Sequence, residues 1–196
     1  MSGLFDFGEL PVLETERLTL RPIGSDDAEA ILRIRGDIEV TRLYTGQPYQ
    51  SITDAESFIA SLGPDYEARR AISWGITLKE VDGVPGEVIG LAALHDIASD
   101  DRRSGVRYEL QRAYWGRGIA SEALRAVLTF AFDQLGLNRV EASCAAINAA
   151  SVRALKRLGF TQEGQQRERH QQDGVYYDRL LFGLLAREFQ GASEAA

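Results

Sequence analysis

The sequence predicts one α/β domain built on a mixed sheet. Three observations favour this class: strand-like alternation and helical spacing of apolar residues follow one another along the chain, hairpin patterns stand at both ends of the expected sheet, and no repeat or low-complexity linker interrupts them. With 196 residues, 44% of them hydrophobic, the chain can bury one sizeable core. We expect the domain over residues 13–190, after an extension over 1–12 and before a polar tail over 191–196 that should be disordered.

The N-terminal third predicts a strand and two helices. Residues 17–22 alternate as a half-buried strand, which Pro22 ends. Helices are expected over 26–36 and 53–63, the second ending at Gly63-Pro64. Each opens on a pair of side chains three residues apart that can cap one another's backbone N–H groups: Asp26 with Glu29, and Thr53 with Glu56.

The middle of the chain predicts three strands. Residues 72–76 and the apolar run 88–94 are separated by turn-forming residues over 82–86, a pattern typical of an antiparallel hairpin. After a polar loop over 100–104, apolar and charged residues alternate over 106–110 as a further strand.

The C-terminal half predicts two helices and three strands. The longest helix spans 121–135, a strand follows over 139–144, and a shorter helix ends at Gly159. A strand begun at Phe160 is expected to pair with a final strand over 177–185. The polar stretch between them, from Gln165 to Gly174, is expected to form a loop, and the apolar final strand leaves both a monomer and a homodimer open.

Composition excludes several classes of function. A formal net charge of -7 and a pI near 5.0 oppose binding to nucleic acid or to an anionic membrane surface, and mildly favour cationic substrates. One cysteine and two histidines provide neither a disulfide framework nor a metal site, and Cys144 is expected to be a buried strand thiol. The acidic first 20 residues lack the features of a secretory signal, and no segment is long enough to span a membrane. We therefore expect a cytoplasmic protein without a metal.

Residues 115–121, Trp-Gly-Arg-Gly-Ile-Ala-Ser, lie between a predicted strand and the longest helix. The first turn of a helix leaves N–H groups unpaired, and glycines let an anion approach the backbone, so a pyrophosphate would fit there. A tight connection without a ligand explains the glycines equally well. A dinucleotide site is disfavoured because Ser121 replaces the third glycine and Glu141 lies inside its strand, and the lysine of a P-loop is absent.

The same segment resembles the glycine-rich turn of the GNAT N-acetyltransferases, Gln/Arg-x-x-Gly-x-Gly/Ala, at Gly118 and Ala120. Trp115 departs from that pattern, but Tyr-Trp-Gly-x-Gly followed by Glu-Ala-Leu is the habit of the RimJ/RimL branch, the ribosomal-protein-alanine N-acetyltransferase type. A second signature, Asn148-x-x-Ser151 ending in Gly-Phe, follows in the expected order. The resemblance extends to residues 13–22 and 174–181, and so covers most of the chain.

This resemblance implies a mixed, mostly antiparallel central sheet with splayed central strands and flanking helices. It also implies acetyl-CoA as cosubstrate, with its pyrophosphate on backbone N–H groups and its pantetheine arm beside the backbone of Tyr108 to Leu110 and the side chain of Asn148. Residue type alone favours Asn148 as a helix N-cap. The residues expected at the pyrophosphate are Trp115, Gly116, Arg117, Gly118, Ile119, Ala120 and Ser121, with added charge from Arg112 and Arg117.

The expected reaction is direct attack of an amine on the thioester within a ternary complex. Glu109 is the candidate general base because it lies on the strand expected to flank the thioester, although an acid on the outer face of a strand is as often simply solvated. The resemblance implies that Ser151 protonates the leaving thiolate, because it matches the family position for that role, with Tyr108 in reserve. A backbone N–H near Leu110 would stabilise the oxyanion. Surface roles are expected for His95 and His170.

The acceptor is a primary amine, either a protein N-terminus, for which ribosomal proteins are the namesake substrates, or a small molecule. Its site is expected among the N-terminal helices and the loop over 165–174, where Arg167 and Arg169 could face an acidic acceptor. A domain that binds acetyl-CoA only as a sensor or interaction module is the alternative, and the sequence does not separate the two.

Overall fold

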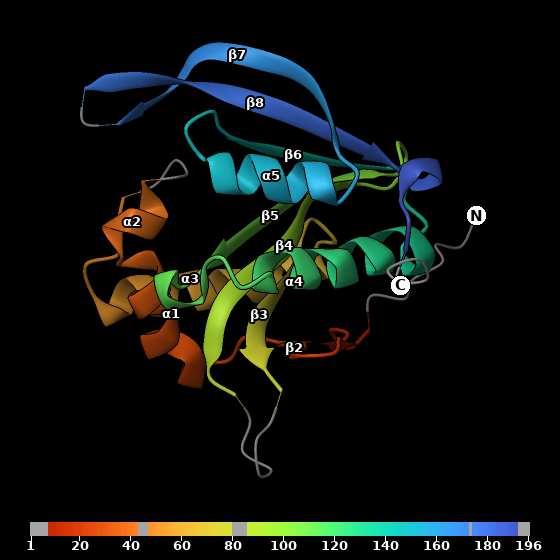
Figure 1. The fold of residues 1–196 in the computed structure, drawn as a ribbon. Helices are drawn as coiled ribbons and strands as arrows, with labels where there is room; N and C mark the ends of the chain where they lie inside the picture. Colours follow the sequence, from red (N-terminus) through yellow and green to blue (C-terminus); the bar gives the residue numbers. More distant parts are fainter. Residues whose placement is uncertain (1–7, 43–46, 80–85, 173, 192–196) are drawn as a thin grey trace.

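The computed structural model describes residues 8–42, 47–79, 86–172 and 174–191. Most of the turn expected over 82–86, most of the N-terminal extension and nearly all of the C-terminal tail lie outside the described residues. The described strands form one sheet with the order β1-β2-β3-β4-β5-β6-β8-β7 (Figure 1). Neighbouring strands are antiparallel except β5 and β6, which are parallel.

The elements follow the chain in this order: β1 Leu13–Glu14, β2 Leu18–Arg21, the 3-10 turn η1 Ser25–Asp27, α1 Ala28–Arg35, α2 Ile38–Thr41, α3 Ile52–Glu67, β3 Ile72–Leu78, β4 Val88–Ala98, β5 Arg103–Leu110, η2 Arg112–Tyr114, α4 Ile119–Thr129, the π-helical turn η3 Phe130–Gln134, β6 Arg139–Ala145, α5 Ala149–Arg157, β7 Thr161–Gln172, β8 Val175–Leu185 and η4 Ala186–Glu188.

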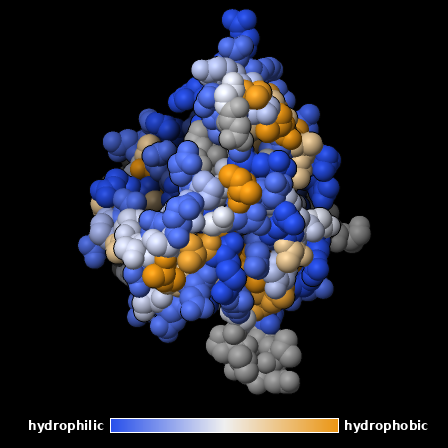
Figure 2. All heavy atoms as spheres, turned by 90° about the vertical axis from the view of Figure 1, so that its left-hand side faces the viewer, coloured by the Kyte–Doolittle hydropathy of each residue, from blue (hydrophilic) through white to orange (hydrophobic). Residues whose placement is uncertain are grey.

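Helices cover the two faces of the sheet separately (Figure 1). On one face α4 and α5 bury Leu124 and Leu155 in the larger core, together with Ala92 of β4. On the other face α1 packs with α3, and its Ile31 lies in a second core with Leu91 of β4. Side chains of successive strand residues point to opposite faces, so β4 supplies apolar residues to both cores. The surface turned to the left in Figure 1 is mainly hydrophilic, and its hydrophobic residues form small separate groups (Figure 2).

The two central strands separate after a short paired stretch. Strand β5 pairs with β6 only from Arg103 to Gly105, opposite Arg139 to Glu141. Beyond Gly105, β5 remains paired with β4 while β6 remains paired with β8. This confirms the mixed, mostly antiparallel sheet with splayed central strands.

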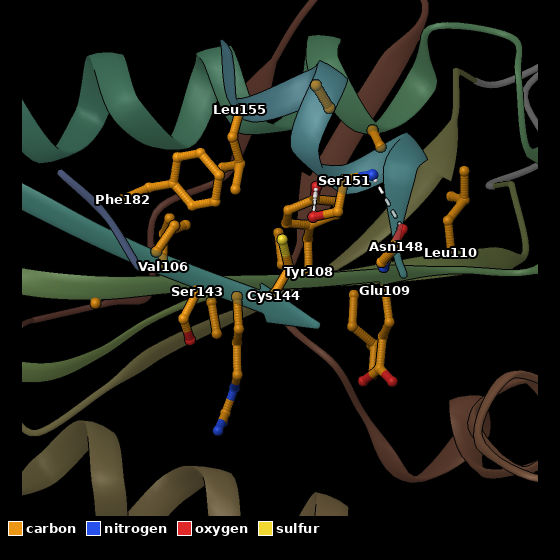
Figure 3. Close-up of a pocket in the computed structure, with 18 of the residues that line it drawn as sticks. Val106, Tyr108, Glu109, Leu110, Ser143, Cys144, Asn148, Ser151, Leu155 and Phe182 are labelled. Carbon is orange, nitrogen blue, oxygen red and sulfur yellow. Dashed lines mark hydrogen bonds between the residues drawn. The ribbon is translucent and has the colours of Figure 1, made fainter. Parts of the chain in front are cut away.

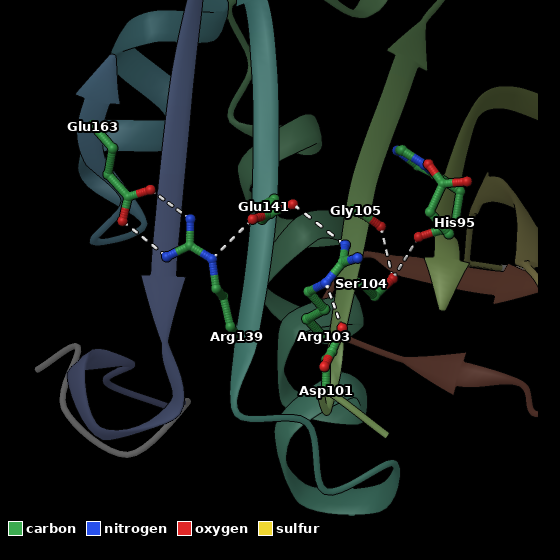
Figure 4. Close-up of polar contacts among 9 residues, drawn as sticks. His95, Asp101, Arg103, Ser104, Gly105, Arg139, Glu141 and Glu163 are labelled. Atoms are coloured by element: carbon green, nitrogen blue, oxygen red, sulfur yellow. Dashed lines mark hydrogen bonds and ion pairs between the residues drawn. The ribbon is translucent and has the colours of Figure 1, made fainter. Parts of the chain in front are cut away.

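A row of charged side chains, which we call the charge ladder, crosses the sheet where β5 and β6 are joined (Figure 4). Arg103 lies 3.3 Å from Asp101 and 3.9 Å from Glu141, and Arg139 donates to Glu141 at 2.9 Å. Arg139 also binds Glu163 of β7 through both of its terminal nitrogens. These hydrogen bonds from Arg139 hold the pKa of Glu163 below its ordinary value. The ladder therefore links β5, β6 and β7 at the closed end of the splay.

The expected helix caps were wrong by one or two residues. At the start of the first helical segment the capping acid is Asp27, not Asp26 or Glu29, because the Asp27 carboxylate accepts the Gly24 N–H at 2.9 Å. At the start of α3, Asp54 accepts the N–H groups of Gln50 and Ser51 at 2.8 and 2.9 Å. Neighbouring acids and hydroxyls satisfy the same sequence pattern, so spacing alone does not select the capping residue.

Two further boundaries differ from those expected. Helix α3 continues through Gly63-Pro64 to Glu67, since the Pro64 carbonyl still accepts the Ala68 N–H at 3.1 Å. The stretch expected as a loop over 165–174 is mostly strand β7, paired with β8 as far as Gln172. Strand pairing depends on main-chain hydrogen bonds, so polar side chains on both faces hide it from the sequence pattern without preventing it.

Candidate active site

A cavity of about 1300 Å³ lies at the splay and is lined from both faces of the sheet. We call its two parts the α4 side and the α3 side. The α4 side includes Tyr108, Leu110, Trp115, Gly116, Gly118, Ala120, Ser121, Asn148 and Ser151, and the α3 side includes Ile23, Arg35, Val40, Tyr49, Phe58, Leu91 and Glu109. Figure 3 shows Tyr108 and Ser151 on one side of the strands and Glu109 on the other, as alternation along β5 requires.

The glycine turn before α4 leaves room for a ligand. Gly116 and Gly118 have φ values of +73° and +77°, which favour glycine. A Cβ on Gly116 would meet nothing within 4 Å, and one on Gly118 would meet only Arg17 Nη2, at 3.5 Å. The first N–H groups of a helix have no intrahelical partner, and Gly118 at the N-cap of α4 has no side chain to bind them. The turn thus needs its glycines as a connection and also fits a pyrophosphate.

The edge of β5 offers main-chain groups to the gap. Gln111 donates its N–H to Ile89 of β4 at 2.9 Å, and backbone groups of successive residues alternate between the two edges of a strand. The N–H and carbonyl groups of Tyr108 and Leu110 therefore face β6 across the splay. Trp115 Nε1 donates to the Leu110 carbonyl at 2.7 Å, which leaves the Leu110 N–H facing the gap. An extended arm that carries amides can pair with such an edge.

Ser151 and Tyr108 form a hydroxyl pair, with 2.7 Å between their oxygens. Ser151 is buried in the first turn of α5, and burial raises the pKa of Tyr108 to about 12. The phenol is therefore protonated at neutral pH and can donate to Ser151. Asn148 caps α5 by accepting the Ser151 N–H at 3.0 Å, and no described residue bonds its side-chain nitrogen. The N-cap role predicted from residue type is thus present, and contact with the pantetheine arm stays a prediction.

Glu109 is not the solvated acid that its strand position also allowed. Only 8% of its side chain is exposed, and its Oε1 accepts from Arg35 Nε at 2.7 Å and Nη2 at 2.5 Å. Its Oε2 is buried without a hydrogen-bond partner among the described residues. One carboxylate oxygen is thus fixed by Arg35 of α1, and the buried Oε2 keeps its capacity to accept a hydrogen bond.

Sequence reasoning did not assign Arg35 to the site. Its guanidinium carbon lies 3.7 Å from the Phe58 ring centroid and 5.5 Å from that of Tyr49, and its Nη1 donates to the Tyr49 hydroxyl at 2.8 Å. Burial lowers the pKa of Arg35, but the adjacent Glu109 and Tyr49 outweigh burial and raise it. A signal was available: Arg35 follows Ile31 by one helical turn, so a charge stands on the apolar stripe of its helix.

Several predicted residues do not line the cavity. Arg112 and Arg117 are exposed, Arg117 lying 5.5 Å from the Tyr114 ring, and Ile119 is buried in the core. Arg167 and Arg169 are exposed on β7. These five residues are absent from the cavity lining, so they reach a ligand only if it extends beyond the cavity.

Both histidines were predicted at the surface, and this is wrong for His170, which is buried on β7. His95 lines the cavity and lies 2.8 Å from Asp96. Cys144 is a buried strand thiol, and burial raises its pKa. The described parts of the chain contain no group of three His, Cys, Asp or Glu residues suited to a metal ion. No helix of the described ranges is long and apolar enough to cross a membrane.

Comparison with known proteins identifies the family. A family model described as an acetyltransferase (GNAT) domain matches residues 17–161. The N-acetyltransferase YoaA of Bacillus subtilis, itself uncharacterized, is 37% identical over 175 residues, covering 89% of this chain and 97% of YoaA. A second uncharacterized N-acetyltransferase, p20 of Bacillus licheniformis, is 34% identical over 182 residues, covering 93% of this chain and all of p20.

A solved structure agrees with these relatives. Mycobacterium smegmatis RimJ in complex with CoA-disulfide has a TM-score of 0.77 and 25% identity, covering 91% of this chain and 87% of RimJ. The likeness to RimJ supports the RimJ/RimL resemblance seen in the glycine turn. The fold, the cavity and these matches agree, and the chain belongs to the GNAT family as an acetyl-CoA-dependent N-acetyltransferase.

Proposed function

We propose that the protein transfers the acetyl group of acetyl-CoA to a primary amine by direct attack in a ternary complex. One observation carries this proposal: a single cavity passes through the splay, with free main-chain donors on its α4 side and a buried, unpartnered carboxylate oxygen on its α3 side. A thioester lying between β5 and β6 would have the acceptor amine on one side and a proton donor on the other. The volume of the cavity exceeds the roughly 300–1,000 Å³ of ordinary ligand pockets, which suits the binding of two substrates.

Acetyl-CoA would occupy the α4 side. Its pyrophosphate would bind the free N–H groups from Gly116 to Ser121, and its pantetheine arm would run along the edge of β5 at Tyr108. The thioester oxygen would then lie near the Leu110 N–H, which can stabilise the negative charge that develops during attack.

The amine must be neutral when it attacks the thioester carbonyl. We assign Glu109 Oε2 to accept a hydrogen bond from the amine and to take up its proton, directly or through water. Attack forms the new C–N bond, and collapse of the tetrahedral intermediate breaks the C–S bond. Ser151 gives its proton to the departing thiolate and can regain one from the Tyr108 hydroxyl. Glu109 releases the amine proton to water, and Tyr108 takes a proton from water, so both return to their starting states.

For the acceptor we propose a protein N-terminus whose first side chain is small or apolar. The α3 side, to which Glu109 belongs, has apolar and aromatic lining residues, namely Ile23, Val40, Tyr49, Phe58 and Leu91. The other acidic residues of the lining already have partners: Glu141 and Glu163 pair with Arg139, and Asp96 with His95. Among the acidic side chains of the described lining, only Glu109 thus has a buried carboxylate oxygen without a hydrogen-bond partner, which suits one ammonium group better than a polyamine.

The test is calorimetric titration with acetyl-CoA, followed by thiol release with a panel of acceptors. The panel contains peptides beginning with Ala, Ser or Asp, the same peptides with a blocked N-terminus, and spermine. We expect release with the unblocked Ala and Ser peptides. Release with spermine alone would replace the proposed acceptor class, binding without release from any acceptor would favour a sensor, and absence of binding would overturn the proposal.

A further inference from the structure

The segment before β2 is tied to the start of α4 across more than 100 residues of sequence. The Arg17 N–H donates to Glu122 Oε1 at 2.9 Å, and its Nε donates to Glu122 Oε2 at 2.7 Å. The Thr15 hydroxyl donates to the same Glu122 Oε1 at 2.6 Å. The Glu122 side chain is 19% exposed and that of Arg17 is 46% exposed, so the carboxylate is partly shielded from water while the guanidinium stays open to it.

Arg17 also reaches the glycine turn itself. Its Nη1 donates to the Arg117 carbonyl at 3.1 Å, and its Nη2 lies 3.5 Å from the place that a Cβ on Gly118 would take. A trans peptide unit is planar, with its carbonyl and N–H pointing in opposite directions. By holding the Arg117 carbonyl, Arg17 therefore directs the Gly118 N–H away from itself.

The position of Glu122 creates an electrostatic problem. It lies in the first turn of α4, next to the N–H groups that we assign to the pyrophosphate. Burial raises the pKa of Glu122, but hydrogen bonds from Thr15 and Arg17 together outweigh burial and lower it, so the carboxylate is charged at neutral pH. A bare carboxylate at this place would repel the pyrophosphate, and Arg17 supplies the opposite charge.

We infer that Arg17 is a positioning residue for the coenzyme, acting by orienting the Arg117–Gly118 peptide and by neutralising Glu122. It does not line the cavity and has no contact with the expected position of the thioester. The inference rests on the proposed pyrophosphate site. It assigns a role in the reaction to residues of the 13–22 segment, which the resemblance covers without giving them a function.

The central experiment compares acetyl-CoA with S-acetylpantetheine, which keeps the thioester arm but lacks the pyrophosphate. For Arg17→Met we expect the KM for acetyl-CoA to rise roughly tenfold, because a charge-assisted contact is lost and Glu122 is left unpaired. We expect kcat at saturating acetyl-CoA to stay unchanged, as well as kcat/KM with S-acetylpantetheine. A general structural defect would lower activity with both donors.

Three further variants sharpen the test. Arg17→Lys keeps the charge but cannot hold Glu122 and Arg117 with one planar fork, so its KM should lie between those of the parent and Arg17→Met. Adding Glu122→Gln to Arg17→Met removes the repelling charge and should recover roughly threefold in KM. Arg70→Met is the matched control, since Arg70 pairs with Asp65 away from the cavity, and it should leave the KM unchanged.

An unchanged KM for acetyl-CoA in Arg17→Met would overturn the inference, and so would equal losses with both donors. If the parent protein fails to bind acetyl-CoA, the proposed function fails first, and the comparison of variants is not reached. If Arg17→Met does not fold, the Arg17→Lys variant and the Glu122→Gln single variant replace it. Their kinetic constants with acetyl-CoA are then compared with those for S-acetylpantetheine in the same way.

Discussion

The two sides of the cavity are built from different chemical groups. On the α4 side the ligand would meet mainly backbone: the glycine turn, the first N–H groups of α4 and the edge of β5. On the α3 side it would meet side chains, with Glu109 held by Arg35, which itself contacts Tyr49 and Phe58. A main-chain site changes little when side chains are exchanged, whereas a site of side chains changes with every substitution. The difference predicts one constant donor and variable acceptors.

The largest expected effect sharpens this contrast from the α3 side. Glu109→Gln should lower kcat about 100-fold, because general base catalysis contributes at least that factor in many enzymes. Acetyl-CoA affinity measured by calorimetry should stay the same, because Glu109 faces the opposite side. Glu141→Gln, on β6 in the same lining, is the control and should keep most of the activity. Equal turnover of Glu109→Gln and parent across pH would remove Glu109 from the reaction.

The reciprocal change is Gly118→Val on the α4 side. A β-branched residue at a φ of +77° is strained by about 1–3 kcal/mol, so the turn should shift. We expect acetyl-CoA to bind roughly 30-fold more weakly, which corresponds to about 2 kcal/mol. Gly63→Val, in helix α3 away from the cavity, should bind normally. Unchanged affinity in Gly118→Val would show that the turn is only a connection.

A smaller effect is expected where side chains contribute to the α4 side. Ser151→Ala should lower kcat roughly tenfold without changing acetyl-CoA affinity, because the hydroxyl would act only on the departing thiolate.

Burial raises the pKa of Tyr108 to about 12, so this phenol stays protonated when the pH rises from 7 to 10. Turnover of the parent should therefore not fall over that range through loss of the Tyr108 proton. Such a fall in the parent, missing from Tyr108→Phe, would contradict this assignment.

The smallest effect is expected for the charge ladder, which we assigned to neither the α4 side nor the α3 side of the cavity. Arg139→Gln breaks the charge ladder, and we expect the free energy of unfolding to fall by about 1 kcal/mol at pH 7, with unchanged acetyl-CoA affinity. Arg139 lowers the folded-state pKa of Glu163, so the stabilisation is present above the ordinary pKa of a glutamic acid and is lost as the pH falls through the lowered one. Urea titrations at several pH values measure this. If the difference in unfolding free energy between the parent and Arg139→Gln grew as the pH became acidic, it would contradict this prediction.

The same contrast explains what could be predicted from the sequence. The α4 side was found because a glycine turn, a strand end and a helix start are neighbours in the chain, and their geometry requires particular residues. Arg35, Tyr49 and Phe58 come from separate elements, and none of them forms a local motif. The sequence marks Arg35 only as a charge on the apolar stripe of its helix, and its contacts with Glu109, Tyr49 and Phe58 arise from packing between elements that the sequence pattern does not give.

For the fold, strands β3 to β6 and helices α4 and α5 could be predicted because their apolar residues either recur with a clear period or, in β4, form a continuous run that is buried on both faces. The part of β7 expected as a loop was missed for the opposite reason. Most of its side chains are polar and exposed, so the strand depends on main-chain hydrogen bonds to β8. Its sequence therefore lacks the alternation of apolar and polar residues that marks a half-buried strand. The predicted positions of the helix caps were wrong where neighbouring acids and hydroxyls satisfy the same capping pattern.

The two tryptophans give the molecule an optical use. Trp74 is fully buried against Phe130, whereas Trp115 is 39% exposed beside the Leu110 carbonyl that it binds. Indole emission lies at shorter wavelength in a dry environment, so a ligand that displaces water from Trp115 should shift only the longer-wavelength part of the spectrum. The shorter-wavelength part should respond to unfolding instead. Occupancy and integrity could then be followed separately in one unlabelled sample.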